Sequence, residues 1–305
     1  MRSPAYQKRF LAWLDAAGMQ HESCHYQRPE AAGEVQAYVF TPALPPRGRV
    51  VYAHATGNDA LFPQLSLFRT LLEAGLEVFT FDLDGHGRQS TTELTEANAR
   101  SSVAAALAEA HSRPPLPTHL IGQSLGGALA LAAALDGAAI CSLTLVSAPL
   151  ALAPGPSALA TELTSALKPA FYREMSTYGI FGIVPAMGPV KRQAYPVRLG
   201  TTPAGTAAAG PQRRSSTPAP AFAYVDVVAR LVAGLDLAAR AHLLTVPTQL
   251  VYGDRDRIVP MSQAQELARL IPHAALALVP GATHYTTLFE RGVASHVAAF
   301  IGEHS

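Results

Sequence analysis

Charge and cysteine are both scarce in this chain of 305 residues. Only 15% of the residues are charged and the net charge is +1, so the chain has no overall field that would attract nucleic acid. Two cysteines, Cys24 and Cys141, are too few for a disulfide framework. Cys141 opens an apolar stretch and is expected in the core. No Cys/His cluster has zinc spacing. The sequence implies neither a metal nor an organic cofactor.

Long apolar runs are also missing. The longest unbroken run of apolar residues and glycine, 125–135, is well below the ~18 residues that a bilayer-spanning helix needs. The apolar stretch at 10–14 is too short for a secretory signal. The sequence therefore predicts a soluble, cytoplasmic protein with no integral membrane segment, and it leaves the oligomeric state open.

Strand-like and helix-like segments alternate at both ends of the chain. Strands are expected at 35–40, 49–53, 77–81, 140–146, 249–252 and 277–279, and a further one after His119 runs straight into the glycine at 122. Helices are expected at 6–17, 61–72, 92–110, 128–135, 262–270 and 292–301. This alternation predicts an α/β fold, with a mostly parallel sheet flanked by helices on both faces.

The alternation stops between residues 150 and 240, where Pro, Ala, Gly, Ser and Thr are abundant. This stretch is too long for a plain loop, and 222–239 has a helical pattern. We expect a cap, or lid, inserted into a core formed by 1–149 and 241–305. The insertion has nine basic and four acidic residues, a net charge of about +5. That charge indicates either a solvated basic surface or a lid that favours anionic substrates or an anionic membrane surface.

The most informative motif is Gly-x-Ser-x-Gly at 122–126. It lies between a strand-like stretch and a small-residue helix, so Ser124 would occupy the apex of a sharp, strained turn and project its hydroxyl from the sheet. Glycines without a Cβ let the strand and the helix approach closely. The start of the helix would direct free N–H groups and partial positive charge at a developing oxyanion. The alternative is a glycine-rich turn with an ordinary serine.

A serine nucleophile needs a base, and that base needs an orienting partner. In a parallel sheet, functional groups collect beyond the carboxyl ends of the strands. His284 is the one histidine that follows a strand after the motif, so it is the predicted general base; the alternative is a loop histidine bonded to backbone. The loop after 249–252 contains Asp254 and Asp256. We favour Asp256, which lies farther into the loop, because Asp254 is better placed to cap the turn.

An oxyanion needs at least two hydrogen-bond donors. The N–H of Leu125, directly after the serine, is the first candidate. The second should come from the turn after the strand at 49–53. The N–H of Thr56 is preferred there, and that of Ala55 is the near alternative.

These stretches together resemble the α/β-hydrolases, and within them the serine-hydrolase branch that contains monoacylglycerol lipases, lysophospholipases and carboxylesterases. The matching segments are 54–57, 82–90, 122–127, 253–260 and 281–284. The resemblance implies that Ser124, Asp256 and His284 form a catalytic triad and that 150–240 is the variable cap. Ala55 and Thr283 stand where the family usually has glycine.

The resemblance also implies that Asp84 and His86 belong to the scaffold beside the site and take no part in the chemistry. The expected function is hydrolysis of a small-molecule carboxylic ester through an acyl-enzyme. Acyltransferases, thioesterases and carbon–carbon bond hydrolases can use the same triad and stay as alternatives. A non-catalytic ligand-binding protein on the same fold is the alternative from another class.

Overall fold

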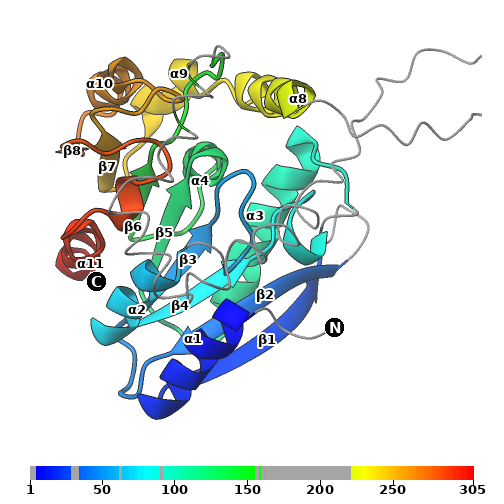
Figure 1. Ribbon diagram of the computed structural model, residues 1–305, viewed down its shortest axis with the longest axis vertical. Coiled ribbons are helices and arrows are strands. Elements are labelled where there is room, and N and C mark those ends of the chain that lie inside the picture. Colours follow the sequence, from blue (N-terminus) through cyan, green and yellow to red (C-terminus); the bar gives the residue numbers. More distant parts are fainter. Residues whose placement is uncertain are drawn as a thin grey trace, which may run out of the picture.

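A computed structural model describes residues 5–28, 34–61, 64–89, 92–154, 158, 162 and 221–305. Its eight strands form one sheet in the order β1-β2-β4-β3-β5-β6-β7-β8 (Figure 1). The strands are β1 Gln20–Gln27, β2 Glu34–Thr41, β3 Gly48–Ala53, β4 Leu76–Phe81, β5 Thr118–Gln123, β6 Ser142–Val146, β7 Thr248–Gly253 and β8 Ala274–Val279. The pairs β1–β2 and β2–β4 are antiparallel, and the six strands β3 to β8 are parallel to one another. The predicted mostly parallel sheet is confirmed.

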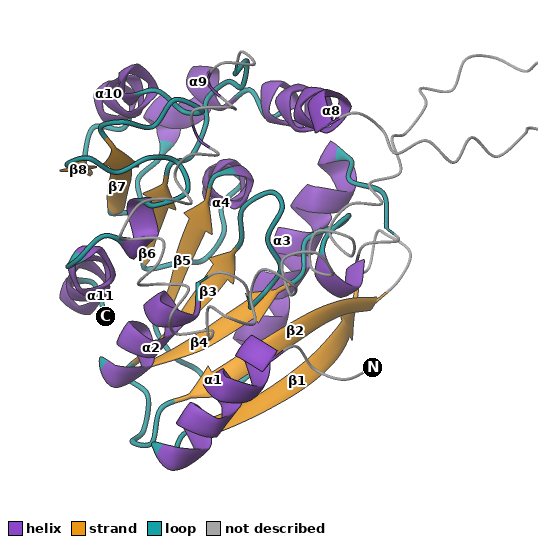
Figure 2. Cartoon of the chain, viewed as in Figure 1, coloured by secondary structure: helices purple, strands orange, loops and turns teal. Residues whose placement is uncertain are grey.

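Helices pack on both faces of this sheet (Figure 2). They are α1 Ala5–Ala16, α2 Leu65–Glu73, α3 Glu96–Ser112, α4 Leu125–Leu135, α8 Ala221–Gly234, α9 Leu237–Arg240, α10 Met261–Leu270 and α11 Val293–Glu303. One apolar cluster joins the sheet to α3, α4, α8 and α10, and the other joins it to α1, α2 and α11. Leu120 and Ile121, neighbours in β5, belong to different clusters because successive strand residues point to opposite faces.

Strand β1 was not among the expected strands. Its residues, Gln20–Gln27, are mostly polar, and most are exposed. The strand exists because it pairs with β2 over eight residues at the edge of the sheet. Such an edge strand has little hydrophobic pattern, so only the tertiary pairing reveals it.

The expectation that Cys141 lies in the core is wrong: the side chain is exposed. Its N–H donates to the Thr118 carbonyl, 2.7 Å away, directly before β6 begins. Burial starts at Ser142, the next residue. Cys141 therefore lies where the chain enters the sheet from the surface, and the apolar run after it could not reveal this.

Most of the expected cap, 150–240, lies outside the described residues. The helix expected at 222–239 is present as two helices, α8 and α9, with Asp236 in a left-handed conformation (φ 48°) between them. Both helices contact α4, and α8 also contacts α3. Within the described part of the chain, no helix is both long and apolar enough to cross a bilayer.

Candidate active site

Ser124 lies between β5 and α4 in a conformation that serine rarely adopts, with φ 51° and ψ −117°. The neighbouring strand holds this turn, because the Ser124 N–H donates to the Val146 carbonyl at 2.8 Å. The flanking glycines are required by space. A Cβ on Gly126 would lie 2.1 Å from the Ala53 carbonyl oxygen, and a Cβ on Gly122 would lie 2.4 Å from the Gly126 carbonyl oxygen. Local strain of this kind is typical of functional turns.

A continuous hydrogen-bond chain starts at this serine. Ser124 Oγ lies 2.9 Å from His284 Nε2, and His284 Nδ1 lies 2.8 Å from Asp256 Oδ2. The three residues are 6%, 7% and 5% exposed, respectively. The structure thus brings together three side chains from three separate strand ends, which meet because β5, β7 and β8 are parallel strands of one sheet.

The two aspartates after β7 have different partners. Asp256 Oδ1 accepts from the N–H groups of Ile258 (3.0 Å) and Val259 (2.8 Å), which leaves Oδ2 for His284. Asp254 Oδ1 instead accepts from the Gly281 N–H at 2.7 Å. Asp254 therefore ties the turn that precedes the histidine, and Asp256 contacts the imidazole itself.

The charges around His284 favour its protonated form. Burial by itself would lower the pKa of His284, but the charge and hydrogen bond of Asp256, together with the charge of Glu162, outweigh burial and raise it. Glu162 is 1% exposed, and its Oε1 accepts from the Arg257 N–H at 2.9 Å. In the sequence, Glu162 is simply one of the four acidic residues of the insertion. Since it lies 95 residues before Arg257, no local motif could have located it.

The turn after β3 is organised by His54. The Leu83 N–H donates to His54 Nε2 at 3.0 Å, so the ring proton is on Nδ1, which donates to the Ala55 carbonyl at 2.9 Å. Burial, with the charge of His86 adding to it, lowers the pKa of His54 to about 3, which keeps the ring neutral. The Ala55 carbonyl and the Thr56 N–H belong to one peptide unit, so His54 fixes the orientation of that candidate donor.

Leu125, the other candidate donor, is the first residue of α4 and is buried. The two departures from the family pattern cause no backbone strain: neither Ala55 nor Thr283 has a positive φ. The Thr283 N–H is held by Thr286 Oγ1 at 3.0 Å. An added Cβ is therefore compatible with the backbone at both positions.

Asp84 and His86 lie beside this turn in a buried network. Arg28 Nη1 contacts both carboxylate oxygens of Asp84, at 2.9 and 3.0 Å, and Ser102 Oγ donates to Asp84 Oδ2 at 2.7 Å. His86 Nδ1 lies 2.8 Å from the Asp84 carbonyl, and its ring meets that of His54 edge to face at 5.2 Å. These contacts hold the loop after β4 against the turn after β3, in keeping with a scaffold role.

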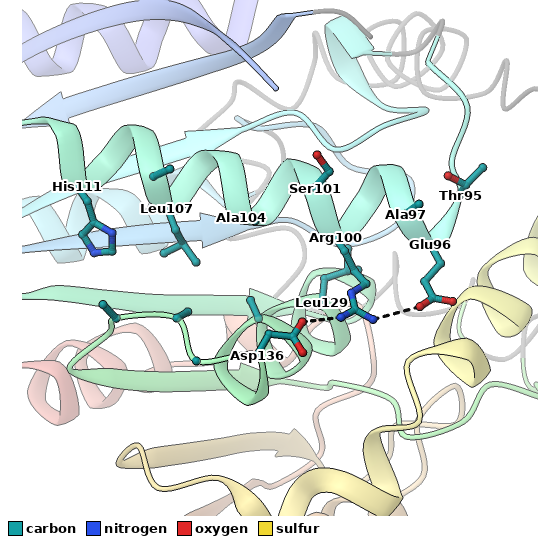
Figure 3. Close-up of a pocket in the computed structure, with 15 residues that line it drawn as sticks. Thr95, Glu96, Ala97, Arg100, Ser101, Ala104, Leu107, His111, Leu129 and Asp136 are labelled. Atoms are coloured by element: carbon teal, nitrogen blue, oxygen red, sulfur yellow. Dashed lines mark hydrogen bonds and ion pairs between the residues drawn. The ribbon is translucent and has the colours of Figure 1, made fainter. Parts of the chain in front are cut away.

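A groove of about 960 Å³ lies between α3 and the C-terminal part of α4 (Figure 3). Neither Ser124 nor His284 is among the residues that line it. Arg100 lies in it between Glu96 (3.3 Å) and Asp136 (2.7 Å), so its charge is compensated there. Across the described ranges, no group of three or more His, Cys, Asp or Glu side chains could hold a metal ion.

Comparisons with known proteins agree with this architecture. A family model described as serine aminopeptidase, S33, matches residues 44–292. A pimeloyl-[acyl-carrier protein] methyl ester esterase from Aliivibrio salmonicida is 29% identical over 222 residues, covering 70% of this chain and 77% of the relative. A monoacylglycerol lipase from Mycolicibacterium smegmatis is 28% identical over 263 residues, covering 81% and 84%.

The fold has counterparts among solved structures as well. An esterase from Pyrococcus furiosus superposes with a TM-score of 0.64 at 14% identity, covering 95% of this chain and 93% of that one. At this identity the likeness concerns the fold alone. With the family match over most of its length, the chain belongs to the serine aminopeptidase S33 family and is a hydrolase of the serine branch of the α/β-hydrolases.

Proposed function

We propose that the protein hydrolyses small-molecule carboxylic esters through an acyl-enzyme on Ser124. The observation that carries this proposal is the hydrogen-bond chain from Ser124 through His284 to Asp256, at 2.9 and 2.8 Å. A serine hydroxyl is a weak nucleophile at neutral pH and gains reactivity when a positioned base accepts its proton. The names of the esterase and lipase relatives support an ester substrate.

In the proposed mechanism, Ser124 Oγ attacks the ester carbonyl while its proton passes to His284 Nε2. Asp256 accepts the Nδ1–H and stabilises the imidazolium. The tetrahedral oxyanion is held by the N–H groups of Leu125 and Thr56. Loss of one such donor typically costs ~3 kcal/mol of transition-state stabilisation. His284 then gives its proton to the departing alcohol, and water, activated by the same imidazole, releases the acid.

The inserted region 150–240 acts, in this proposal, as the cap that selects the acyl group. Its net charge of about +5 would favour esters with an anionic part. A series of p-nitrophenyl esters from acetate to palmitate measures how much acyl chain the site admits. Adding an alcohol acceptor to the same assay separates hydrolysis from acyl transfer: transfer that outcompetes hydrolysis would replace this proposal with an acyltransferase.

Covalent labelling tests the proposal directly. A fluorophosphonate probe should label the protein at Ser124, and Ser124→Ala should abolish both labelling and ester hydrolysis. Ser262→Ala, which changes an exposed serine at the start of α10, is the matched control and should keep both. If folded wild-type protein is not labelled and cleaves no ester, the proposal is wrong, and a non-catalytic ligand-binding protein on this fold replaces it.

Amide cleavage is a second candidate, because the matching family model is named for an aminopeptidase. The same serine and imidazole could attack a peptide carbonyl, with His284 protonating the departing amine. An aminoacyl p-nitroanilide, assayed beside the matching aminoacyl ester, distinguishes the two. Ester turnover without anilide turnover would remove this candidate.

A further inference from the structure

The acid-bearing loop after β7 is held by a series of backbone hydrogen bonds. Its first amide donors are bound by carbonyl oxygens of the neighbouring core: the Asp254 N–H by Val279 at 3.2 Å and the Arg255 N–H by Ala282 at 2.9 Å. The Asp256 N–H donates to the Gly253 carbonyl at 3.2 Å. The beginning of the loop is thus attached to β7, β8 and the histidine turn.

The end of the loop is held by carboxylates. The N–H groups of Ile258 and Val259 donate to Asp256 Oδ1, as described above. Between these groups and the first part of the loop lies the Arg257 N–H, which donates to Glu162 Oε1 at 2.9 Å. Glu162 therefore binds the residue directly after the aspartate that contacts His284.

Glu162 is buried, with 1% of its surface exposed, and belongs to the inserted segment after β6. Burying a carboxylate is costly, so a buried one that binds the loop carrying Asp256 is informative. The groups facing His284 among the described residues come from three places: Asp256 in the loop after β7, Ser124 at the turn after β5, and the adjacent Tyr285, whose ring lies edge-on at 5.7 Å. Glu162 adds a second negative charge that acts on this imidazole.

We propose that Glu162 is a positioning residue: it holds the Asp256 loop against the imidazole and supplies a second negative charge to the imidazolium that His284 becomes. This inference rests on the proposed function, since it assigns His284 the role of base. Its physical basis is that a charge fixed in a buried site stabilises a developing opposite charge without reorganisation. A segment outside the core sheet thereby contributes to the protonation behaviour of the site.

Two substitutions separate the two contributions. Glu162→Gln keeps an oxygen that can accept from the Arg257 N–H but removes the charge, and Glu162→Ala removes both. Glu303→Gln, at the exposed C-terminal end of α11, makes the same change of charge far from the site and is the control. Each variant is examined by imidazole NMR titration without substrate, with His284 assigned through His284→Gln, and by the pH profile of kcat/KM for p-nitrophenyl acetate.

The Gln variant should titrate His284 at lower pH than the wild type, and the acidic limb of kcat/KM should move to lower pH with it. Its melting temperature should stay close to that of the wild type. The Ala variant should shift the same way and also lose about tenfold in kcat/KM, because the unanchored loop moves the carboxylate that orients the base.

A titration of His284 in Glu162→Gln that matches both the wild type and Glu303→Gln would overturn the charge contribution. A Glu162→Ala enzyme with kcat/KM within twofold of the wild type would overturn the positioning contribution. The NMR titration needs no turnover, so it stays interpretable if fluorophosphonate labelling fails. A folded wild-type protein that is neither labelled nor able to cleave ester would overturn the proposed function. An unchanged titration with normal labelling would overturn only the charge contribution of Glu162. If the Ala variant does not fold, the Gln variant still decides the question of charge.

Discussion

Replacing Asp256 by asparagine should reverse the hydrogen-bond direction through His284. Oδ1 of Asp256 accepts two backbone N–H groups, those of Ile258 and Val259, at 3.0 and 2.8 Å. An asparagine would keep its carbonyl oxygen on these two donors and point its NH2 group at His284 Nδ1. Because an amide NH2 can only donate, Nδ1 would have to accept and the ring proton would move to Nε2. That nitrogen faces Ser124 Oγ at 2.9 Å and could then no longer take the serine proton.

Two free-energy costs compete in this variant, and the smaller one sets the loss of activity. In serine proteases, the wrong tautomer lowers kcat about 10⁴-fold, which is about 5.4 kcal/mol at 1.36 kcal/mol per factor of ten. Turning the asparagine over would keep the tautomer but leave two buried N–H groups unpaired, at about 1–3 kcal/mol each. The lower bound, about 2 kcal/mol, corresponds to roughly 30-fold. We therefore expect kcat to fall between about 30-fold and 10⁴-fold.

The measurement is kcat for p-nitrophenyl acetate, with circular dichroism and a thermal melt to establish folding. Asp254→Asn is the control, because Asp254 Oδ1 accepts one N–H, that of Gly281, and an asparagine oxygen can do the same. It should lose less than about tenfold, since it does not contact the imidazole. Two results would refute the reasoning on which carboxylate orients the base. One is that Asp256→Asn keeps kcat within threefold of the wild type, and the other is that Asp254→Asn loses more kcat than Asp256→Asn does.

Three further predictions concern packing, pH and buried charge. Gly126→Ala should lower kcat/KM about 100-fold, because the new Cβ would lie 2.1 Å from the Ala53 carbonyl oxygen. Gly302→Ala is the control and should leave kcat/KM unchanged, because its Cβ would meet only a flexible arginine side chain. Equal kcat/KM values for the two variants would contradict the prediction. Burial lowers the pKa of His284, but the neighbouring carboxylates outweigh it and raise the pKa above its ordinary 6.5. Since the base must be unprotonated, kcat/KM should fall as the pH drops through a value above 6.5. An acidic limb of the kcat/KM profile below pH 6.5 would contradict this. Arg28→Met should lower the free energy of unfolding in urea by about 3–5 kcal/mol, because it leaves the fully buried carboxylate of Asp84 without its ion-pair partner; a loss under about 1 kcal/mol would show that the pair contributes little.

The fold and the strained turn at Ser124 were predictable because their signals are local. Strands β3 to β7 are buried along their whole length and read as continuous apolar-rich runs between helical patterns. Ser124 follows from a glycine spacing that steric contact demands at 2.1 and 2.4 Å. His284 followed from elimination, since parallel strands bring their carboxyl ends to one edge. Position along the chain was enough for these predictions because strand order restricts which loops can meet.

Other features required the tertiary structure. The sequence favoured Asp256 over Asp254 only by its place in a loop, whereas the direction of each carboxylate is decided by which backbone N–H groups surround it. Cys141 and strand β1 were misjudged or missed because exposure and edge pairing depend on neighbours distant in the chain.

By itself, then, the sequence determined the α/β architecture, the turn that presents Ser124 and the histidine that can reach it, because periodicity and glycine spacing act over a few residues. Only the tertiary structure decided that His54 orients the Ala55–Thr56 peptide and that Glu162 holds the loop of Asp256. Those contacts join segments 29 and 95 residues apart, as His54 to Leu83 and Glu162 to Arg257. Their geometry is set by packing across the whole sheet, which no local pattern encodes.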